Sequence, residues 1–260
     1  MSSAPAGNQT PPEQQEMPLI EHLLELRNRL LKMVLAVIIC FAVIYPFANE
    51  LYLLLSQPLR ELLPVGQMMI ATDITSPFFA PLKLALVLAV FAAIPVILYQ
   101  LWSFIAPGLY AHEKRLAFPL LFTSVILFYG GAAFAYFVVF PLVFGFFTAI
   151  GPEGIVELPD ITSYLNFVLK MFFAFGVAFE IPIATVLLIL TGATTPQDLA
   201  AKRPYVVVGC FIIGMLLTPP DIISQTLLAV PMWILFEFGI LFGRLAYRQR
   251  QDDAEGEPEA

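Results

Sequence analysis

Charged residues are scarce in this chain of 260 amino acids. Asp, Glu, Lys and Arg together make up 13% of it, whereas soluble domains contain about 25%. Hydrophobic residues reach 59%, and the mean hydropathy is +0.84. This composition excludes an ordinary soluble domain and predicts a protein that crosses a membrane several times. The formal net charge of -7 says little about partners, because much of it lies in the tails.

Residues that build catalytic or metal centres are equally few. The two cysteines, Cys40 and Cys210, lie in apolar runs and indicate no disulfide framework. The two histidines, His22 and His112, lie outside the predicted spans, which argues against a metal site or an intramembrane serine protease. An intramembrane aspartyl protease is excluded because the aspartates before the C-terminal tail all lie in loops: Asp73, Asp160, Asp198 and Asp221. Phosphate-binding glycine loops, HExxH and CxxC are absent too, so we expect no enzyme, metal or cofactor.

Long apolar runs predict an all-α integral membrane protein with six spans. Residues 1–16 are rich in Ser, Pro, Gln and Glu and are predicted to be disordered. Residues 17–32 carry leucines at helical spacing, which predicts an amphipathic helix on the membrane surface. Residues 17–243 then form one membrane domain, and residues 244–260 form an acidic cytoplasmic tail. The spans cover roughly residues 31–53, 82–105, 116–147, 164–190, 204–218 and 222–243.

The basic residues predict how the spans are oriented. With an even number of spans, both termini lie on one side of the membrane. That side carries ten basic residues, and the other side carries three: Arg60, Lys83 and Lys170. Because positive charge is enriched in cytoplasmic loops, we expect both termini in the cytoplasm.

The lengths of two spans are unusual. The third could reach 32 residues, or about 48 Å. It must therefore tilt, bend at Gly130-Gly131 or project beyond Pro141. The fifth is confined between Pro204 and the prolines at 219–220, and its ~21 Å falls short of a bilayer core of ~30 Å. Its ends should lie at unusual depth, which favours a docking edge for another helix.

One acid, Glu180, is predicted to lie near mid-depth in the fourth span, two residues before Pro182. A proline there removes the helical donor for the carbonyl of Ala178, so a kink and a small polar pocket are expected. An acid inside a span is a functional candidate by default. One interpretation is an internal hydrogen bond with Gln225 or with a hydroxyl on another span. The other is a hydrated cavity that is used in function.

Prolines interrupt or border most of the spans, at Pro46, Pro95, Pro119, Pro141, Pro182 and Pro231. Each kink re-aims a helix and exposes backbone polar groups to neighbouring helices. A bundle of bent helices forms a concave wall more readily than a tight cylinder. Such a surface suits the docking of another helix or of a peptide.

Glutamates near the ends of the spans can be explained by structural roles, without a binding function, when only their sequence neighbours are considered. Glu25 can pair with Arg29 at the i, i+4 spacing of a helix. Glu113 lies beside Lys114 in a bent loop whose positive charges fix topology. Glu237 is expected at the membrane–water interface, where its carboxylate either snorkels toward water or pairs with a basic side chain.

Six motifs taken together resemble the TatC family, the multi-spanning receptor subunits of the twin-arginine protein translocase. They are HLLELRNRLL, MIATDITSPFF, YQLWSFIAPGLYAHEKR, FAYFVVFPLVFGFF, FGVAFEIP and KRPYVVVG…GMLLTPPDIISQ. The resemblance runs from about Pro18 to Arg244. It implies a curved, glove-like bundle in a bacterial inner membrane. It also implies recognition of folded cargo with twin-arginine signal peptides, exported by the proton-motive force.

The resemblance also implies roles for particular residues. Glu25 and Glu113 match acids of the signal-peptide-binding face, near the residue that matches Phe104. Glu180 matches the family's buried acid on the concave face, and Gln225 is grouped with it here as the intramembrane polar site. The surface that docks the single-span partners TatA and TatB matches Met215, Leu216 and Thr218. A homo-oligomer within a receptor complex is expected, and Ala111 replaces a basic residue that some relatives carry.

Two other functions fit the same spans. A proton-coupled small-molecule transporter could use Glu180, although a lone acid and the lack of an inverted repeat argue against it. A passive scaffold for single-span subunits would need no signal-peptide site.

Overall fold

The computed structural model describes residues 17–57, 60, 69–105, 114–150, 160–217 and 222–256. Apart from one β-bridge between Ile70 and Asp160, all regular elements in these ranges are helices. They are α1 (Met17–Ile44), η2 (Tyr45–Phe47), α2 (Ala48–Leu55), α4 (Ser76–Ile105), α5 (Lys114–Phe134), η4 (Ala135–Val139), α6 (Phe140–Ile150), α7 (Ile161–Ala178), α8 (Ile181–Leu190), α9 (Pro196–Ala201), α10 (Arg203–Leu217) and α11 (Ile222–Gly256).

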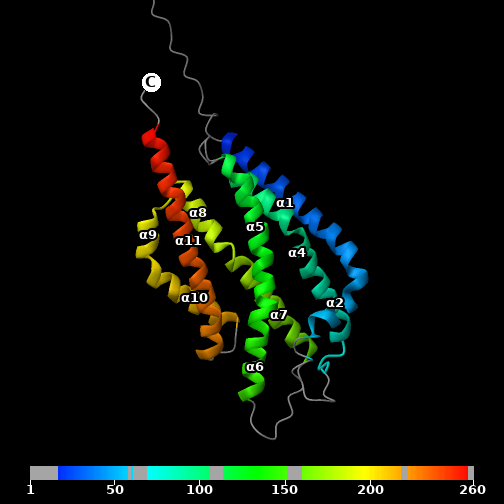
Figure 1. Ribbon diagram of the computed structural model, residues 1–260. Coiled ribbons are helices and arrows are strands. Elements are labelled where there is room, and N and C mark those ends of the chain that lie inside the picture. The colour runs from blue at the N-terminus through cyan, green and yellow to red at the C-terminus, as the bar shows by residue number, and fades with distance from the viewer. Residues whose placement is uncertain are drawn as a thin grey trace, which may run out of the picture.

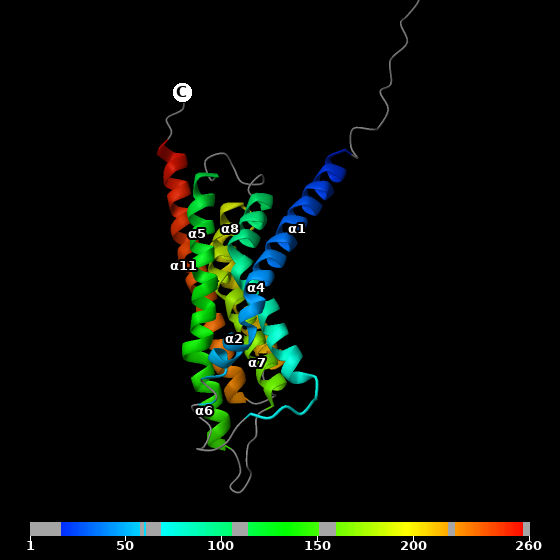
Figure 2. The same cartoon turned by 90° about the vertical axis from the view of Figure 1, so that its right-hand side faces the viewer.

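Five helical segments in these ranges are long and apolar enough to cross a membrane: Leu23–Leu55, Ser76–Phe104, Phe118–Phe146, Ile161–Leu190 and Gln225–Arg248. The fifth predicted span corresponds to α10, whose 15 residues reach only about 22 Å. The prediction of an all-helical membrane protein is confirmed. In Figure 2, α1 and α11 lie on opposite sides of the bundle, and in Figures 1 and 2 the start of α1 and the end of α11 lie at the same end.

The amphipathic residues 17–32 and the first span form one helix. α1 runs unbroken from Met17 to Ile44, so residues 17–32 continue directly into the span. After Pro18 in its first turn, α1 contains no proline, and Pro46 lies in the 3₁₀ turn η2 that follows. None of the best apolar window of this span is buried within the chain, and Figure 2 shows α1 leaning away from the other helices. α1 therefore offers a long apolar face to its surroundings.

The third span changes helix type shortly before Pro141. Residues 135–139 form a π-helix directly before Pro141. Proline lacks an N–H and its ring clashes with the carbonyl four residues earlier, and a π-bulge absorbs this mismatch. At Gly131, one of the two glycines considered as a bend, a Cβ would collide with the backbone carbonyl of Phe175. This glycine thus permits close packing of α5 against α7, as small residues do between membrane helices.

The fourth span breaks where the sequence predicts. α7 ends at Ala178 and α8 begins at Ile181, with Pro182 in the first turn of α8. Glu180 lies at the break. Its N–H donates to the carbonyl of Val177 at 3.0 Å, and its carbonyl accepts from the N–H of Ala184 at 2.9 Å. The kink predicted from Pro182 is confirmed.

Asp160 fastens the segment before α4 to the start of α7. Its carboxylate accepts from the N–H of Ser163 at 2.9 Å, as an N-cap, and from the N–H and hydroxyl of Thr72 at 3.1 and 2.8 Å. These bonds, the one from Ser163 foremost, lower the pKa of Asp160 to about 2. The N–H of Ile161 also donates to the carbonyl of Ile70 at 2.9 Å. Residues 70–72 are therefore tied to the helix rather than loose.

The buried core surrounds α7. Apolar side chains from α4, η4, α6 and α11 enclose its inner face, and the largest fully buried ones include Leu84, Phe140, Leu165, Met171, Phe175 and Leu228. Phe172 packs edge-on against Phe140, with ring centroids 5.2 Å apart. This packing fixes α7, and with it the depth of Glu180.

Candidate functional sites

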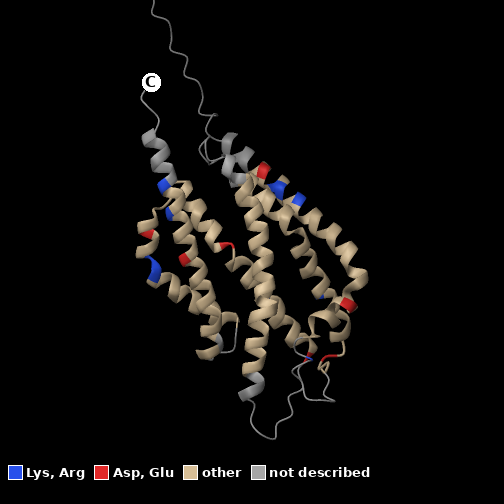
Figure 3. Cartoon of the chain, in the orientation of Figure 1, with Lys and Arg blue, Asp and Glu red and all other residues tan. Residues whose placement is uncertain are grey.

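A polar recess lies between α1 and α4. It is at the end of the bundle where α1 starts and α11 ends. It encloses about 540 Å³ and is lined by residues that include Glu25, Arg29, Lys32, Tyr99, Gln100 and Ser103. Figure 3 shows the basic residues of α1 and α11 gathered toward this end of the molecule. The recess is thus where charged groups meet the apolar body of the protein.

An ion pair organises this recess. The Arg29 guanidinium contacts the Glu25 carboxylate through Nη2 and also donates from Nε to Oε1 at 3.1 Å. Its Nη1 donates to the carbonyl of Gln100 at 3.2 Å. Arg29 therefore links α1 to α4 while it holds Glu25. The Glu25 side chain keeps 42% of its surface exposed, against 16% for Arg29, so a ligand can reach the carboxylate.

The predicted signal-binding residues are placed only in part. Glu25 lies in the recess, and Phe104 is half-buried on the last turn of α4, directly after Ser103 of the recess wall. Glu113 lies outside the described residues. The pairing of Glu25 with Arg29 expected from helical spacing is confirmed.

Glu180 is an inward-facing acid. Ser124 on α5 donates its hydroxyl to Oε2 of Glu180. The other oxygen, Oε1, is buried without a hydrogen-bond partner among the described residues. The sequence left open a hydroxyl or Gln225 as the partner, and the structure shows the hydroxyl. Gln225 instead donates to the carbonyl of Phe211 at 2.7 Å, which joins α11 to α10.

The predicted docking edge on α10 is exposed. Met215 and Leu216 retain 50% and 69% of their surface, and Thr218 lies outside the described residues. At the other end of α10, Arg203 forms a two-pronged ion pair with Glu237 of α11, with both N–O distances 2.7 Å. Glu237 is thus paired, which was one of its two expected states.

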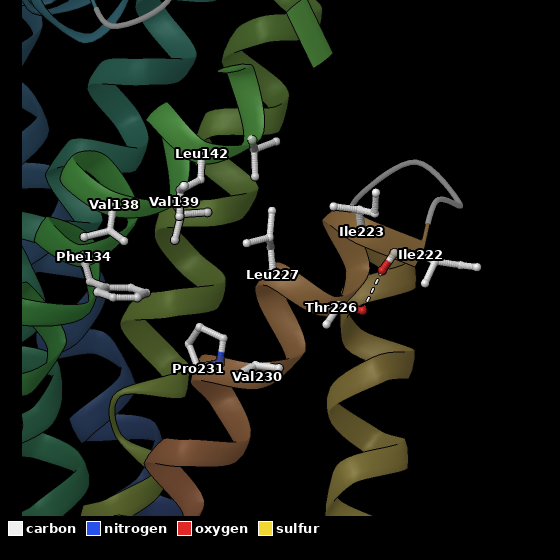
Figure 4. Close-up of a pocket in the computed structure, with 11 residues that line it drawn as sticks. Phe134, Val138, Val139, Leu142, Ile222, Ile223, Thr226, Leu227, Val230 and Pro231 are labelled. Atoms are coloured by element: carbon white, nitrogen blue, oxygen red, sulfur yellow. Dashed lines mark hydrogen bonds between the residues drawn. The ribbon is translucent and has the colours of Figure 1, made fainter. Parts of the chain in front are cut away.

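Sequence reasoning missed an apolar groove between the third span and the first half of α11. It has a volume of about 490 Å³. Figure 4 shows side chains of the two walls, which include Phe134, Val138, Leu142, Ile223, Leu227 and Pro231. The prolines at 141 and 231 signal irregular helices on both sides, but neither indicates that the two walls face each other.

Together these features define a class of protein. An open bundle of bent spans has one charged recess at its terminal end, one inward acid and apolar grooves along its sides. No group of His, Cys, Asp or Glu that could hold a metal occurs in the part of the chain that the structure describes. The chain is a helical membrane protein whose chemistry is suited to binding other molecules at its surfaces.

Comparison with known proteins narrows this class. The family model for the Sec-independent protein translocase protein (TatC) matches residues 21–231, so this chain belongs to the TatC family. The chain is 58% identical over 247 residues to a TatC of Azotobacter chroococcum mcd 1, covering 95% of this chain and 97% of that one. It is 59% identical over 227 residues to the TatC of Escherichia coli (strain K12), covering 87% and 88%.

A solved structure has the same fold. The crystal structure of the twin-arginine translocase receptor TatC superposes with a TM-score of 0.78 at 40% identity, covering 86% of this chain and 99% of that chain. The chain is therefore a multi-pass membrane component of a Sec-independent protein translocase. The family consists of translocase components rather than enzymes. The family assignment made from the six motifs is confirmed.

Proposed function

We propose that this protein is the receptor subunit of a twin-arginine translocase and binds signal peptides at the recess between α1 and α4. The carrying observation is an accessible carboxylate, Glu25, at the charged end of an otherwise apolar bundle. Ten of the thirteen basic residues lie on the predicted terminal side, which supports placing both termini in the cytoplasm of a bacterium. The signal peptide would then meet Glu25 before it enters the membrane.

The chemistry of the recess suits an arginine pair. A guanidinium is a planar, permanently charged fork that matches a carboxylate. Arg29 already donates from Nε and Nη2 to one oxygen of Glu25, Oε1, so the site accommodates a guanidinium. An incoming arginine must share Glu25 with Arg29 or displace it, and Glu113 supplies the second acid in this proposal.

Ion pairs alone do not account for the affinity. An exposed pair contributes about 0.2–1 kcal/mol, while low-micromolar binding needs about 8 kcal/mol. The exposed apolar face of α1, with Leu23, Leu30 and Val34 at 63%, 55% and 48% exposure, provides a surface for the apolar stretch of the peptide. The acids would therefore set specificity, and apolar contact would provide most of the affinity.

Single-span subunits of the TatA and TatB kind are the proposed partners of the α10 edge. Met215 and Leu216 face outward there, and the short helix leaves an edge that a longer helix can cover. Gln225 lies beside this edge on α11. Together with Glu180, whose Oε1 is buried without a partner among the described residues, it forms the intramembrane polar site in this proposal. Export driven by the proton-motive force and a receptor complex with several copies of this chain belong to the same proposal.

Crosslinking to a signal peptide tests the proposal. The purified protein, with a photo-crosslinker at Tyr99 in the recess wall, is mixed with a synthetic twin-arginine signal peptide. We expect a crosslink that a peptide with two lysines in place of the arginines forms at least ten-fold less. A Glu25→Gln variant should lose the preference for arginine while it stays folded. Equal crosslinking of the arginine and lysine peptides would refute recognition of twin arginines at this recess. The protein would then be a scaffold or a transporter.

A further inference from the structure

A second, larger groove opens on the end of the bundle away from the termini. It has a volume of about 690 Å³ and runs between α4, α7 and α10. Most of its wall is apolar, with residues that include Val87, Leu169, Phe173, Val177, Ile213 and Met232. Two lysines, Lys83 on α4 and Lys170 on α7, also line it. None of the described residues that line the groove is acidic.

The two lysines lie at similar depth. Lys83 is seven residues from the start of α4, and Lys170 is nine residues from the start of α7. At ~1.5 Å per residue these positions are about 10 and 14 Å along their helices. Both helices start at the end of the bundle opposite the termini (Figure 1). Lysine side chains at such positions extend toward the headgroup region of the nearer leaflet.

Neither lysine has a carboxylate partner within the described part of the chain. Lys83 donates to the side-chain oxygen of Asn166, which is neutral, and both lysines are exposed. Ionisable residues within spans normally pair with an opposite charge or with polar groups, because an unpaired charge there is costly. Two neighbouring ammonium groups at the head of an apolar groove therefore complement an anion that carries a hydrocarbon chain.

We propose that this groove binds an anionic phospholipid of the outer leaflet, with its phosphate on Lys83 and Lys170 and an acyl chain along the apolar wall. A protein helix is a poorer fit. Close helix packing in membranes relies on small residues, and large side chains such as Leu169, Phe173 and Val177 dominate this wall. A flexible acyl chain adapts to such a surface. This site is separate from the recess at Glu25 and does not depend on the proposed signal-peptide function.

Native mass spectrometry of the delipidated protein tests the site. The protein is titrated with phosphatidylglycerol or with phosphatidylcholine, and bound lipid is counted. We expect clear preference for phosphatidylglycerol. A lysine near an anionic headgroup contributes about five-fold in affinity, so Lys83→Gln with Lys170→Gln should weaken phosphatidylglycerol binding about 25-fold. Arg60→Gln, which alters the third basic residue predicted on this side, is the matched control and should bind like the wild type.

A second variant tests the apolar half of the site. Val177 is 50% exposed in the groove wall, so Val177→Trp should fill the groove and reduce binding of both lipids without lowering the unfolding temperature. Equal binding of the two lipids, or unchanged binding by the double lysine variant, would overturn the proposal. So would displacement of the lipid by millimolar inorganic phosphate, which would indicate an ion site only. A membrane crosslink from position 177 to a single-span protein instead of lipid would assign the groove to a partner helix.

Discussion

The hydrogen bond between Ser124 and Glu180 offers a sharp test of the intramembrane site. Ser124 of α5 is 1% exposed and donates to Oε2 of Glu180, which lies at the break between α7 and α8. Ser124→Ala removes this donor and leaves both carboxyl oxygens of Glu180 without a partner among the described residues. In Glu180→Ala, by contrast, the serine hydroxyl can turn to the carbonyl four residues earlier on its own helix. The two single variants therefore damage the site in different ways.

The size of the effect follows from these roles. Leaving a buried polar group unsatisfied costs about 1–3 kcal/mol, and hydrogen bonds between membrane helices contribute ~0.6 kcal/mol on average and ~1.7 at most. We expect Ser124→Ala to destabilise the protein by about 1–2 kcal/mol. That is about 2–8 °C in unfolding temperature for a chain of this length. The double variant should reveal a coupling of about 1 kcal/mol, since each single variant already removes the shared bond.

Thermal unfolding in detergent measures the four members of this cycle. Thr123→Val is the control, because the exposed Thr123 hydroxyl bonds within its own helix to the carbonyl of Pro119 at 2.9 Å. Additive effects of Ser124→Ala and Glu180→Ala would refute the reasoning. An export assay adds the functional arm. Glu180→Gln should keep substantial activity because it retains shape and hydrogen bonding, and wild-type export by Glu180→Leu would exclude any polar role.

Three further predictions concern other sites. Glu113→Ala should abolish export of twin-arginine cargo while the protein still inserts, as measured by export and protease mapping. Near-normal peptide binding by that variant would remove Glu113 from the site. The stability that the Asp160 carboxylate contributes is present above its unfolded pKa near 3.9 and is lost as pH falls toward its folded pKa of about 2. Asp160→Asn should therefore be less stable at pH 7 and speed proteolysis of residues 69–75. The two proteins should differ less by pH 2, and a difference unchanged with pH would contradict the role of the charge. Cysteines at Met215 or Leu216 should crosslink to a single-span partner in membranes, and reaction with lipid-soluble reagents alone would place the docking edge elsewhere.

The sequence predicts those features that depend on local chemistry. The break at Glu180 follows from Pro182, and the Glu25–Arg29 pair follows from helical spacing. Apolar length alone identifies the five segments that are long enough to cross a membrane, and it also marks α10 as a shorter apolar helix. These predictions succeed because each depends on residues within a few positions of one another.

Features that depend on packing between distant segments were not predictable in the same way. Ser124 and Glu180 are 56 residues apart. To predict that they are partners, one must know that α5 packs beside the break at Glu180. Gly131 suggests a bend by its type, but close packing against α7 decides its role. The groove in Figure 4 lies between the third span and the first half of α11, and no single run of sequence encodes which two walls face each other.

The anchoring of residues 70–72 by Asp160 has a consequence for the order of events during synthesis. Thr72 and Asp160 are 88 residues apart, and the ribosome adds about 5–20 residues per second. Roughly 4–18 seconds therefore pass between the synthesis of the segment and the synthesis of its anchor. During that interval the newly inserted first two spans lack the contact that closes their connection. A variant that slows insertion of the fourth span should lengthen this interval, and the nascent chain should then be cut by external proteases within residues 69–75 even though the finished protein resists them.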